Sequence, residues 1–170
     1  MMKTRRILIA AMIAVLMATI TACGIYSFTG ASYGSAKTVS IDYFQNRSTY
    51  VNSTLTSKIT EDLKDRFMSQ TPLSLVKEGG DLHFEGTITG YTITTAAIKA
   101  GETAASNRLT ITLKVTFTNQ TAPENDFDKS YSRYADYDVS QSFSSVESAL
   151  VDEIVEQLID DIFNDSVVNW

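Results

Sequence analysis

The sequence predicts an α+β domain, a two-layer sandwich in which a mixed four-stranded β-sheet carries two helices packed on one face. Several segments alternate apolar and polar residues with a period of two, which is typical of strands with one buried face. Two other segments repeat apolar residues every three or four positions, as amphipathic helices do. The order is strand, helix, three or four strands, helix. A strand that returns to its sheet through a helix is most simply a right-handed crossover between parallel neighbours.

The first strand and the first helix occupy residues 37–71. Residues 37–44 alternate apolar Val39, Ile41 and Tyr43 with polar neighbours, and residues 45–52 follow as a loop. Asn52 or Ser53 is placed to cap a helix. The apolar residues of that helix recur every four positions, namely Leu55, Ile59, Leu63 and Phe67, and Thr71-Pro72 ends it.

The next strands form a meander with short connections. An extended segment begins at Leu73, Gly79-Gly80 makes a turn or bulge, and alternation resumes from Leu82 to about Ile98. Residues 99–107 are predicted to be a hairpin loop. Residues 108–119 show the clearest strand pattern, with one apolar and one threonine-rich face. No predicted helix is left to cover the threonine-rich face.

The last strand and the last helix complete the sandwich. A turn at residues 121–125 leads into a strand at 126–137, one side of which carries Phe127, Tyr131, Arg133, Ala135 and Tyr137. Ser144-Ser145-Val146-Glu147 has the spacing of a capping box. The helix that follows has two adjacent apolar rows, which predict a broad buried face. Its acidic residues Asp152, Glu153, Glu156, Asp160 and Asp161 are expected on the opposite, solvated side.

The N-terminus has the pattern of a bacterial lipoprotein precursor. Lys3, Arg5 and Arg6 precede an apolar run at residues 7–18 that is too short to span a bilayer, and Cys23 follows small residues. We expect residues 1–22 to be a signal peptide, Cys23 to receive a diacylglycerol, and residues 23–36 to tether a domain at 37–170. Gly24, rather than Asp, favours the outer membrane, on its periplasmic side. The alternative is an ordinary secreted protein in which Cys23 is incidental.

Charge and cysteine content restrict the function classes. Without residues 1–22 the chain has 148 of its 170 residues and a formal net charge of −9, which argues against nucleic acid as a partner. Cys23 is the sole cysteine, so no intramolecular disulfide can form. The size is that of one domain with its own core.

Catalytic and metal-binding motifs are not apparent. His83 is the sole histidine and is expected on the sheet face opposite Leu82 and Phe84. Without a second histidine or a free cysteine, we expect no zinc site of the usual ligand sets and no cofactor. The nucleophile elbow, the P-loop and the dinucleotide fingerprint do not occur in the sequence.

Aromatic and basic residues gather in two segments, and these are the candidates for recognition. Tyrosine and arginine are enriched in protein interfaces because they combine apolar area with polar tips. The predicted partner-interface residues are Tyr43, Phe44, Arg47, Arg133, Tyr134 and Tyr137. The alternative is that the tyrosine-rich strand simply packs against its neighbours.

The order and spacing of several short motifs resemble the lipopolysaccharide-assembly lipoprotein family LptE. These motifs are CGIYSF at residues 23–28, VSIDYFQNR at 39–47, GDLHFEG at 80–86, NRLTI at 107–111, YSRYADY at 131–137 and IVEQL at 154–158. The family's fold is similar to the sandwich predicted above. The resemblance implies a non-enzymatic plug inside the LptD β-barrel of the outer membrane, where the pair delivers lipopolysaccharide to the outer leaflet. It also implies a contact of Lys99 and Arg108 with lipopolysaccharide.

Two other functions compete with this one. Some lipoprotein activators of cell-wall synthases carry a similar small α/β domain on a tether. A hydrolase of envelope glycans or lipids would need paired acids such as Asp136 and Asp138.

Overall fold

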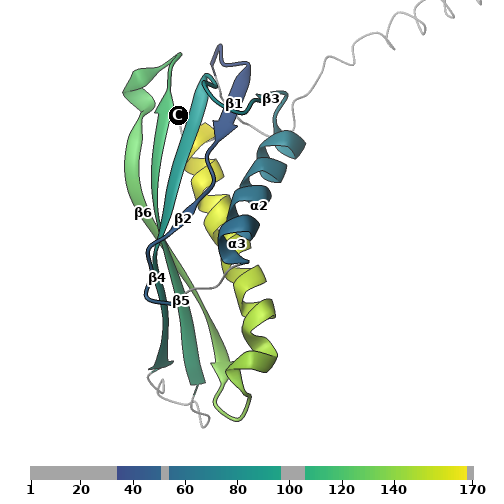
Figure 1. Ribbon diagram of the computed structural model, residues 1–170, viewed down its shortest axis with the longest axis vertical. Coiled ribbons are helices and arrows are strands. Elements are labelled where there is room, and N and C mark those ends of the chain that lie inside the picture. The colour runs from purple at the N-terminus through teal and green to yellow at the C-terminus, as the bar shows by residue number, and fades with distance from the viewer. Residues whose placement is uncertain (1–33, 51–53, 97–105, 168–170) are drawn as a thin grey trace, which may run out of the picture. The chain divides into compact units, whose positions relative to one another are not determined.

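The computed structural model describes residues 34–50, 54–96 and 106–167 (Figure 1). The predicted signal peptide, Cys23, most of the predicted tether and Lys99 lie outside these residues.

The described strands form one mixed sheet of six strands. They are β1 (Thr38–Ile41), β2 (Gln45–Asn46), β3 (Ser74–Leu75), β4 (Leu82–Ala96), β5 (Ser106–Asn119) and β6 (Phe127–Asp138). The strand order is β3-β1-β4-β5-β6, and β2 also pairs with β4. The mixed sheet is confirmed, but the predicted count of four strands was wrong. β2, of two residues, falls in the segment predicted to be a loop. β3, also of two residues, lies in the extended segment predicted from Leu73 but is a strand separate from β4.

Parallel and antiparallel pairing divide as predicted. The helix that follows β1 leads the chain back to parallel neighbours on both sides of β1, with Val39 opposite Leu75 of β3 and Leu82 of β4. β2 is also parallel to β4, whereas β4–β5 and β5–β6 are antiparallel.

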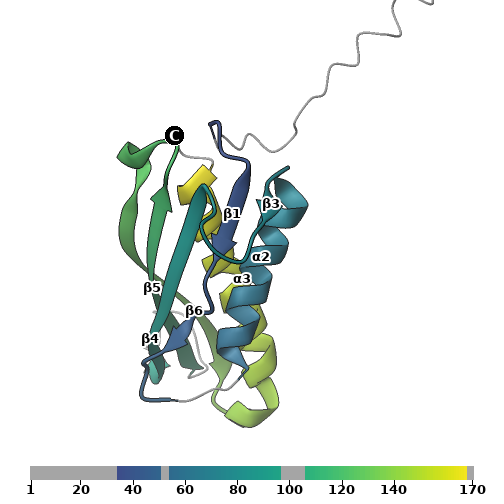
Figure 2. The ribbon, with the colours of Figure 1, turned by 45° about the horizontal axis from the view of Figure 1, so that its top comes forward.

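Two helices, α2 (Leu55–Gln70) and α3 (Phe143–Val167), lie on one face of the sheet (Figures 1 and 2). The predicted end of α2 at Thr71 is confirmed, since Thr71 is its C-cap. Its N-cap is Thr54, just after the predicted Asn52 and Ser53, which lie outside the described residues. The predicted capping box was wrong, because α3 already begins at Phe143. A short 3₁₀-helix, η2 (Pro123–Asn125), occupies the predicted turn before β6.

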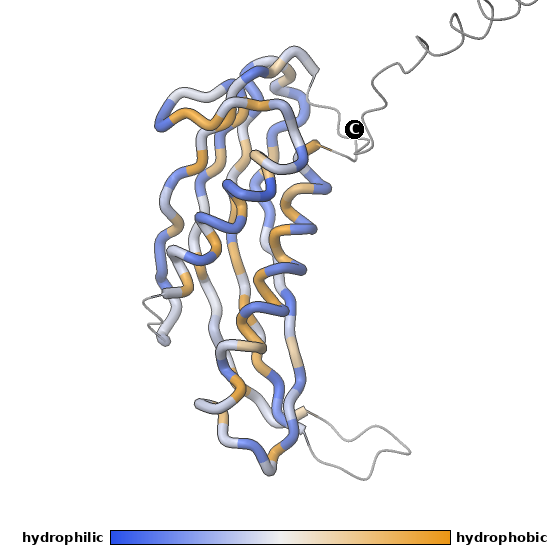
Figure 3. The backbone as a smooth tube through the Cα atoms, turned by 90° about the vertical axis from the view of Figure 1, so that its right-hand side faces the viewer, coloured by the Kyte–Doolittle hydropathy of each residue, from blue (hydrophilic) through white to orange (hydrophobic). Residues whose placement is uncertain are grey.

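The core lies between the sheet and the helices. Five apolar side chains of β5 are fully buried, as its alternation predicts, namely Leu109, Ile111, Leu113, Val115 and Phe117. Figure 3 shows hydrophobic and hydrophilic residues interspersed along the strands and the helices. In β4 the register shifts between Ile88 and Gly90, so the buried positions change from Phe84 and Ile88 to the odd-numbered Tyr91. This bulge explains why one period does not describe the whole strand.

Candidate functional site

The sheet face opposite the two helices is polar, and we call it the outer face. Threonines of β5 point to it, as predicted, and Thr112 Oγ1 lies 3.0 Å from Ser132 Oγ of β6. Lys114 Nζ pairs with Asp128 Oδ2 at 3.0 Å across the same two strands. The charge of Lys114 is therefore neutralised by a carboxylate on the neighbouring strand.

Arg108 and Tyr134 lie at one end of the outer face. The Arg108 guanidinium donates two hydrogen bonds to Asp136, of 2.7 and 2.8 Å, and lies 3.5 Å from the centroid of the Tyr134 ring. These hydrogen bonds to Asp136 raise the pKa of Arg108. Tyr134 is half exposed and remains a candidate for contact with a partner. Arg108 already has a carboxylate partner, which weakens the case for a free cation at this position.

Tyr43 and Arg47 come together at a pocket of about 300 Å³ beside β1, β2 and β4. Tyr43 is 57 % exposed, and its hydroxyl oxygen lies 2.5 Å from Ser57 Oγ of α2. Hydrogen bonds with Ser57 and Thr56 lower the pKa of Tyr43. The pocket is lined by Asp42, Tyr43, Gln45, Arg47, Glu85, Gly86, Thr87, Lys114 and Thr116. It is therefore a mixed acidic and basic site, which sequence reasoning had seen only in part.

Two predicted interface residues belong to the core instead. Phe44 is fully buried, and its ring occupies the space above Gly86 that a side chain would otherwise fill. Tyr137 is 8 % exposed and packs against Phe143 at 5.9 Å between ring centroids. Both side chains are enclosed by their own domain, which argues against the predicted contact of Phe44 and Tyr137 with a partner.

Arg133 lies on the helix side of β6. Its guanidinium donates two hydrogen bonds of 2.6 Å to Asp161 of α3, and these raise its pKa. Three acidic residues of α3 expected to be merely solvated have cationic partners: Asp152 with Lys58, Asp160 with Arg66, and Asp161 with Arg133. The described structure thus gives Arg133 a role in joining helix and sheet, and its contact with a partner stays a prediction.

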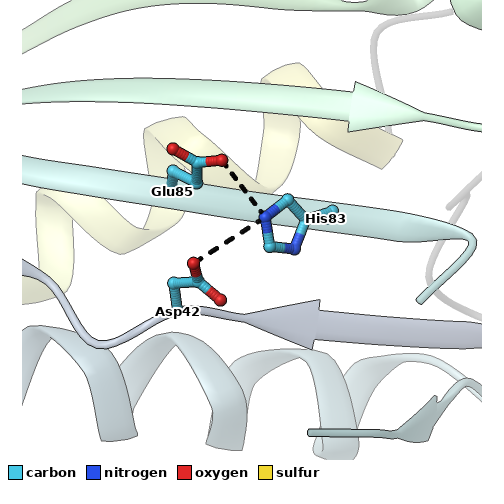
Figure 4. Close-up of side chains that lie close together, drawn as sticks. All are labelled: Asp42, His83 and Glu85. Carbon is cyan, nitrogen blue, oxygen red and sulfur yellow. Dashed lines mark ion pairs between the residues drawn. The ribbon is translucent and has the colours of Figure 1, made fainter. Parts of the chain in front are cut away.

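A cluster of ligand-type side chains that the sequence did not predict lies on the outer face (Figure 4). His83 Nε2 is 3.4 Å from Glu85 Oε1 and 3.9 Å from Asp42 Oδ2. Asp42 and Glu85 also line the pocket beside Arg47. A signal was present: Asp42, directly after β1, is two residues beyond Ser40, just as Glu85 is two residues beyond His83 in β4. Only the parallel register, with Ser40 opposite His83, was missing.

The acidic pair considered for hydrolysis has no catalytic geometry. Asp136 is engaged by Arg108. The hydroxyl and backbone N–H of Ser140 lower the pKa of Asp138. A general acid needs a raised pKa, so Asp138 does not meet this requirement.

Comparisons with known proteins show the fold and the family. A hypothetical protein of Chlamydia trachomatis superimposes with a TM-score of 0.50 at 8 % identity, covering 77 % of this chain and 98 % of that one. A neuraminyllactose-binding hemagglutinin homologue of Helicobacter pylori gives a TM-score of 0.50 at 7 % identity, covering 77 % and 83 %. At such identities these structures share the fold alone. No curated protein matches the chain in sequence.

Within the part of the chain that the structure describes, neither helix combines the length and the apolarity that crossing a bilayer requires.

The family model described as LptE, lipopolysaccharide-assembly, matches residues 36–166, which include nearly all of the described sandwich. The chain therefore belongs to the LptE family of lipopolysaccharide-assembly proteins.

Proposed function

We propose that the protein is a non-enzymatic outer-membrane lipoprotein that plugs an LptD-like β-barrel and assists its assembly, so that lipopolysaccharide reaches the outer leaflet. The family match over residues 36–166 is the observation that carries this proposal. The membrane anchor in the proposal is the lipid on Cys23, held on the periplasmic side. Two or three acyl chains anchor a protein stably where one would not.

Over β5 and β6, the outer face has the properties that an enclosed surface needs. A buried charge is costly unless it is paired, and a buried polar group is costly unless it is hydrogen-bonded. Arg108 and Lys114 are already paired with Asp136 and Asp128. Among the described residues, every buried side-chain nitrogen and oxygen has a hydrogen-bond partner. A barrel wall could therefore cover this part of the face without burying an unpaired charge of Arg108 or Lys114. Half-exposed Tyr134 supplies apolar area for the contact.

A direct contact with lipopolysaccharide is a weaker part of the proposal. Of the two residues that would make it, Lys99 lies outside the described residues and Arg108 is already bound to Asp136. The plug and the lipid contact are separable, and only the plug is supported by the geometry of the outer face.

Co-purification tests the plug directly. The tagged lipoprotein, extracted with a mild detergent, should bring down a large outer-membrane barrel protein. We expect Ser132→Arg, on the outer face of β6, to lose the barrel, because it places an unpaired charge in the contact. Ser148→Arg makes the same change at an exposed position of α3 and should retain it.

The anchor and the alternative functions have their own outcomes. Metabolic labelling with palmitate should mark the wild type and leave Cys23→Ser unlabelled. Depletion should make the envelope permeable to large antibiotics, whereas loss of a cell-wall synthase activator would change cell shape. Recovery of the wild type as a lone monomer in every detergent would refute the plug.

A further inference from the structure

The Asp42, His83 and Glu85 cluster has the composition and spacing of a cation site. The candidate ligand atoms of these three side chains all lie within 4.8 Å of one another. Ligand atoms around a tetrahedral zinc ion are separated by about 3.3 Å, as follows from bond lengths near 2.0 Å. The distance of 3.4 Å from His83 Nε2 to Glu85 Oε1 already meets this value, and that of 3.9 Å to Asp42 Oδ2 is close to it.

His83 is held in the orientation that a metal ligand needs. Its Nδ1 lies 2.8 Å from the hydroxyl oxygen of Ser40, which is fully buried. Ser40 is in turn fixed by a 3.1 Å hydrogen bond from the backbone N–H of Gly80. Metal-binding histidines usually bond through their second ring nitrogen to such an outer partner, which fixes the ring and its tautomer. Because a hydroxyl can both donate and accept, Ser40 can satisfy Nδ1–H while Nε2 keeps its lone pair for a cation.

The charge of the cluster also favours a cation. Two carboxylates converge on one imidazole nitrogen, and of the two cationic side chains that line the adjoining pocket, Lys114 is already paired with Asp128. Their side chains are at least half exposed, so both can adjust by the small shift that coordination requires, and water can complete the shell.

We propose that Asp42, His83 and Glu85 bind a divalent first-row transition-metal ion, with Zn²⁺ as the probe. One imidazole and two carboxylates suit Zn²⁺ better than Mg²⁺ or Ca²⁺, which prefer oxygen ligands alone. The prediction of no zinc site considered only the usual histidine and cysteine ligand sets. The parallel pairing of β1 with β4 supplies a different set by bringing Asp42 beside His83. Zn²⁺ binding at this site does not require the barrel partner.

The single histidine makes the test unambiguous. In tag-free protein lacking residues 1–23, every imidazole resonance in a proton–carbon NMR spectrum comes from His83. Titration with Zn²⁺ should shift those resonances to saturation at one equivalent, and isothermal calorimetry should give the same stoichiometry. Histidine must lose its proton to bind, so the affinity should fall as the pH is lowered.

Three variants separate this site from nonspecific binding to an acidic surface. His83→Gln, and the double variant Asp42→Asn with Glu85→Gln, should each weaken Zn²⁺ binding about tenfold or more. Glu124→Gln removes an exposed carboxylate from η2 and should leave the affinity unchanged. Circular dichroism confirms that each variant is folded. Imidazole resonances that do not move at millimolar Zn²⁺, or a calorimetric affinity that His83→Gln leaves intact, would overturn the proposal.

Discussion

Replacing Gly86 with alanine tests the packing that removes Phe44 from the predicted interface. A Cβ added at Gly86 would lie 2.0 Å from Cε1 of Phe44 and 2.3 Å from two further atoms of that ring. Carbon atoms in contact are normally about 3.5–4.0 Å apart, so ring or strand must move by well over 1 Å. Phe44 is fully buried, so a displaced ring must disturb the packing around it.

The size of the effect follows from two opposing contributions. Overpacking of a closed core costs about 1–3 kcal/mol. Alanine restricts the unfolded chain more than glycine does, which stabilises the protein by about 0.5–1 kcal/mol. A distance of only 2.0 Å between the added Cβ and the Phe44 ring places the steric cost at the upper end of its range, so it exceeds the stabilisation from the restricted unfolded chain. We expect Gly86→Ala to lower the free energy of unfolding by about 2 kcal/mol.

Urea unfolding followed by far-UV circular dichroism measures this difference. Gly90→Ala is the matched control on the same strand, since its Cβ would lie 3.2 Å from the Thr112 side chain. Its effect should stay within about 1 kcal/mol. Phe44→Ala alone should cost about 3–5 kcal/mol, and in that background Gly86→Ala should lose its penalty. An equal penalty in both backgrounds would refute the packing described here.

Three further predictions concern other parts of the chain. Asp81 accepts hydrogen bonds from the backbone N–H groups of Lys37 and Thr38, which lower its pKa. Because the pKa of Asp81 is lower in the folded state than in the unfolded state, its carboxylate stabilises the protein at pH values above the unfolded-state pKa of about 3.9. This contribution is lost as the pH falls through the folded-state pKa. Asp81→Asn should therefore lower the urea midpoint at pH 7 but not in acid; a difference that grows in acid would contradict this. Leu158→Ala, in the buried face of α3, should cost about 2–5 kcal/mol in the same assay, whereas exposed Glu156→Ala should change stability little. Cys23→Ser should lack the acyl chains that mass spectrometry detects on the wild type, and a wild type without them would contradict the lipid anchor.

The elements with regular patterns were predictable from the sequence. The alternation of β5 identified all five of its buried apolar residues. The apolar stripe of α2 from Leu55 to Phe67 and the double row of α3 also correspond to buried faces. In each case the spacing of the apolar residues identifies the buried face, because residues on one face of a strand or helix recur with the period of that element.

Features that depend on pairing between distant segments were not predictable. The two polar residues of β2 carry no strand pattern and are extended only because they pair with β4. Phe44 ends the predicted first strand and was expected to contact a partner. Its ring is instead buried where Gly86, more than forty residues later in the chain, leaves room for it.

The candidate site depended on register in the same way. Asp42 and His83 become neighbours only through the parallel pairing of β1 with β4. The ion pair between Arg133 and Asp161 likewise needs the placement of α3 on β6. Composition and spacing named several of the right residue types, but not which of them meet.

Site-specific photocrosslinking tests the proposed plug most directly. A photoreactive amino acid at Ser132 on the outer face of β6 and one at Ser148 on α3 would be compared in intact cells. We predict that Ser132 gives an adduct with an LptD-like barrel protein and that Ser148 gives little. An adduct from Ser148 alone would contradict the assignment of the outer face, and the absence of a barrel adduct from both positions would contradict the plug.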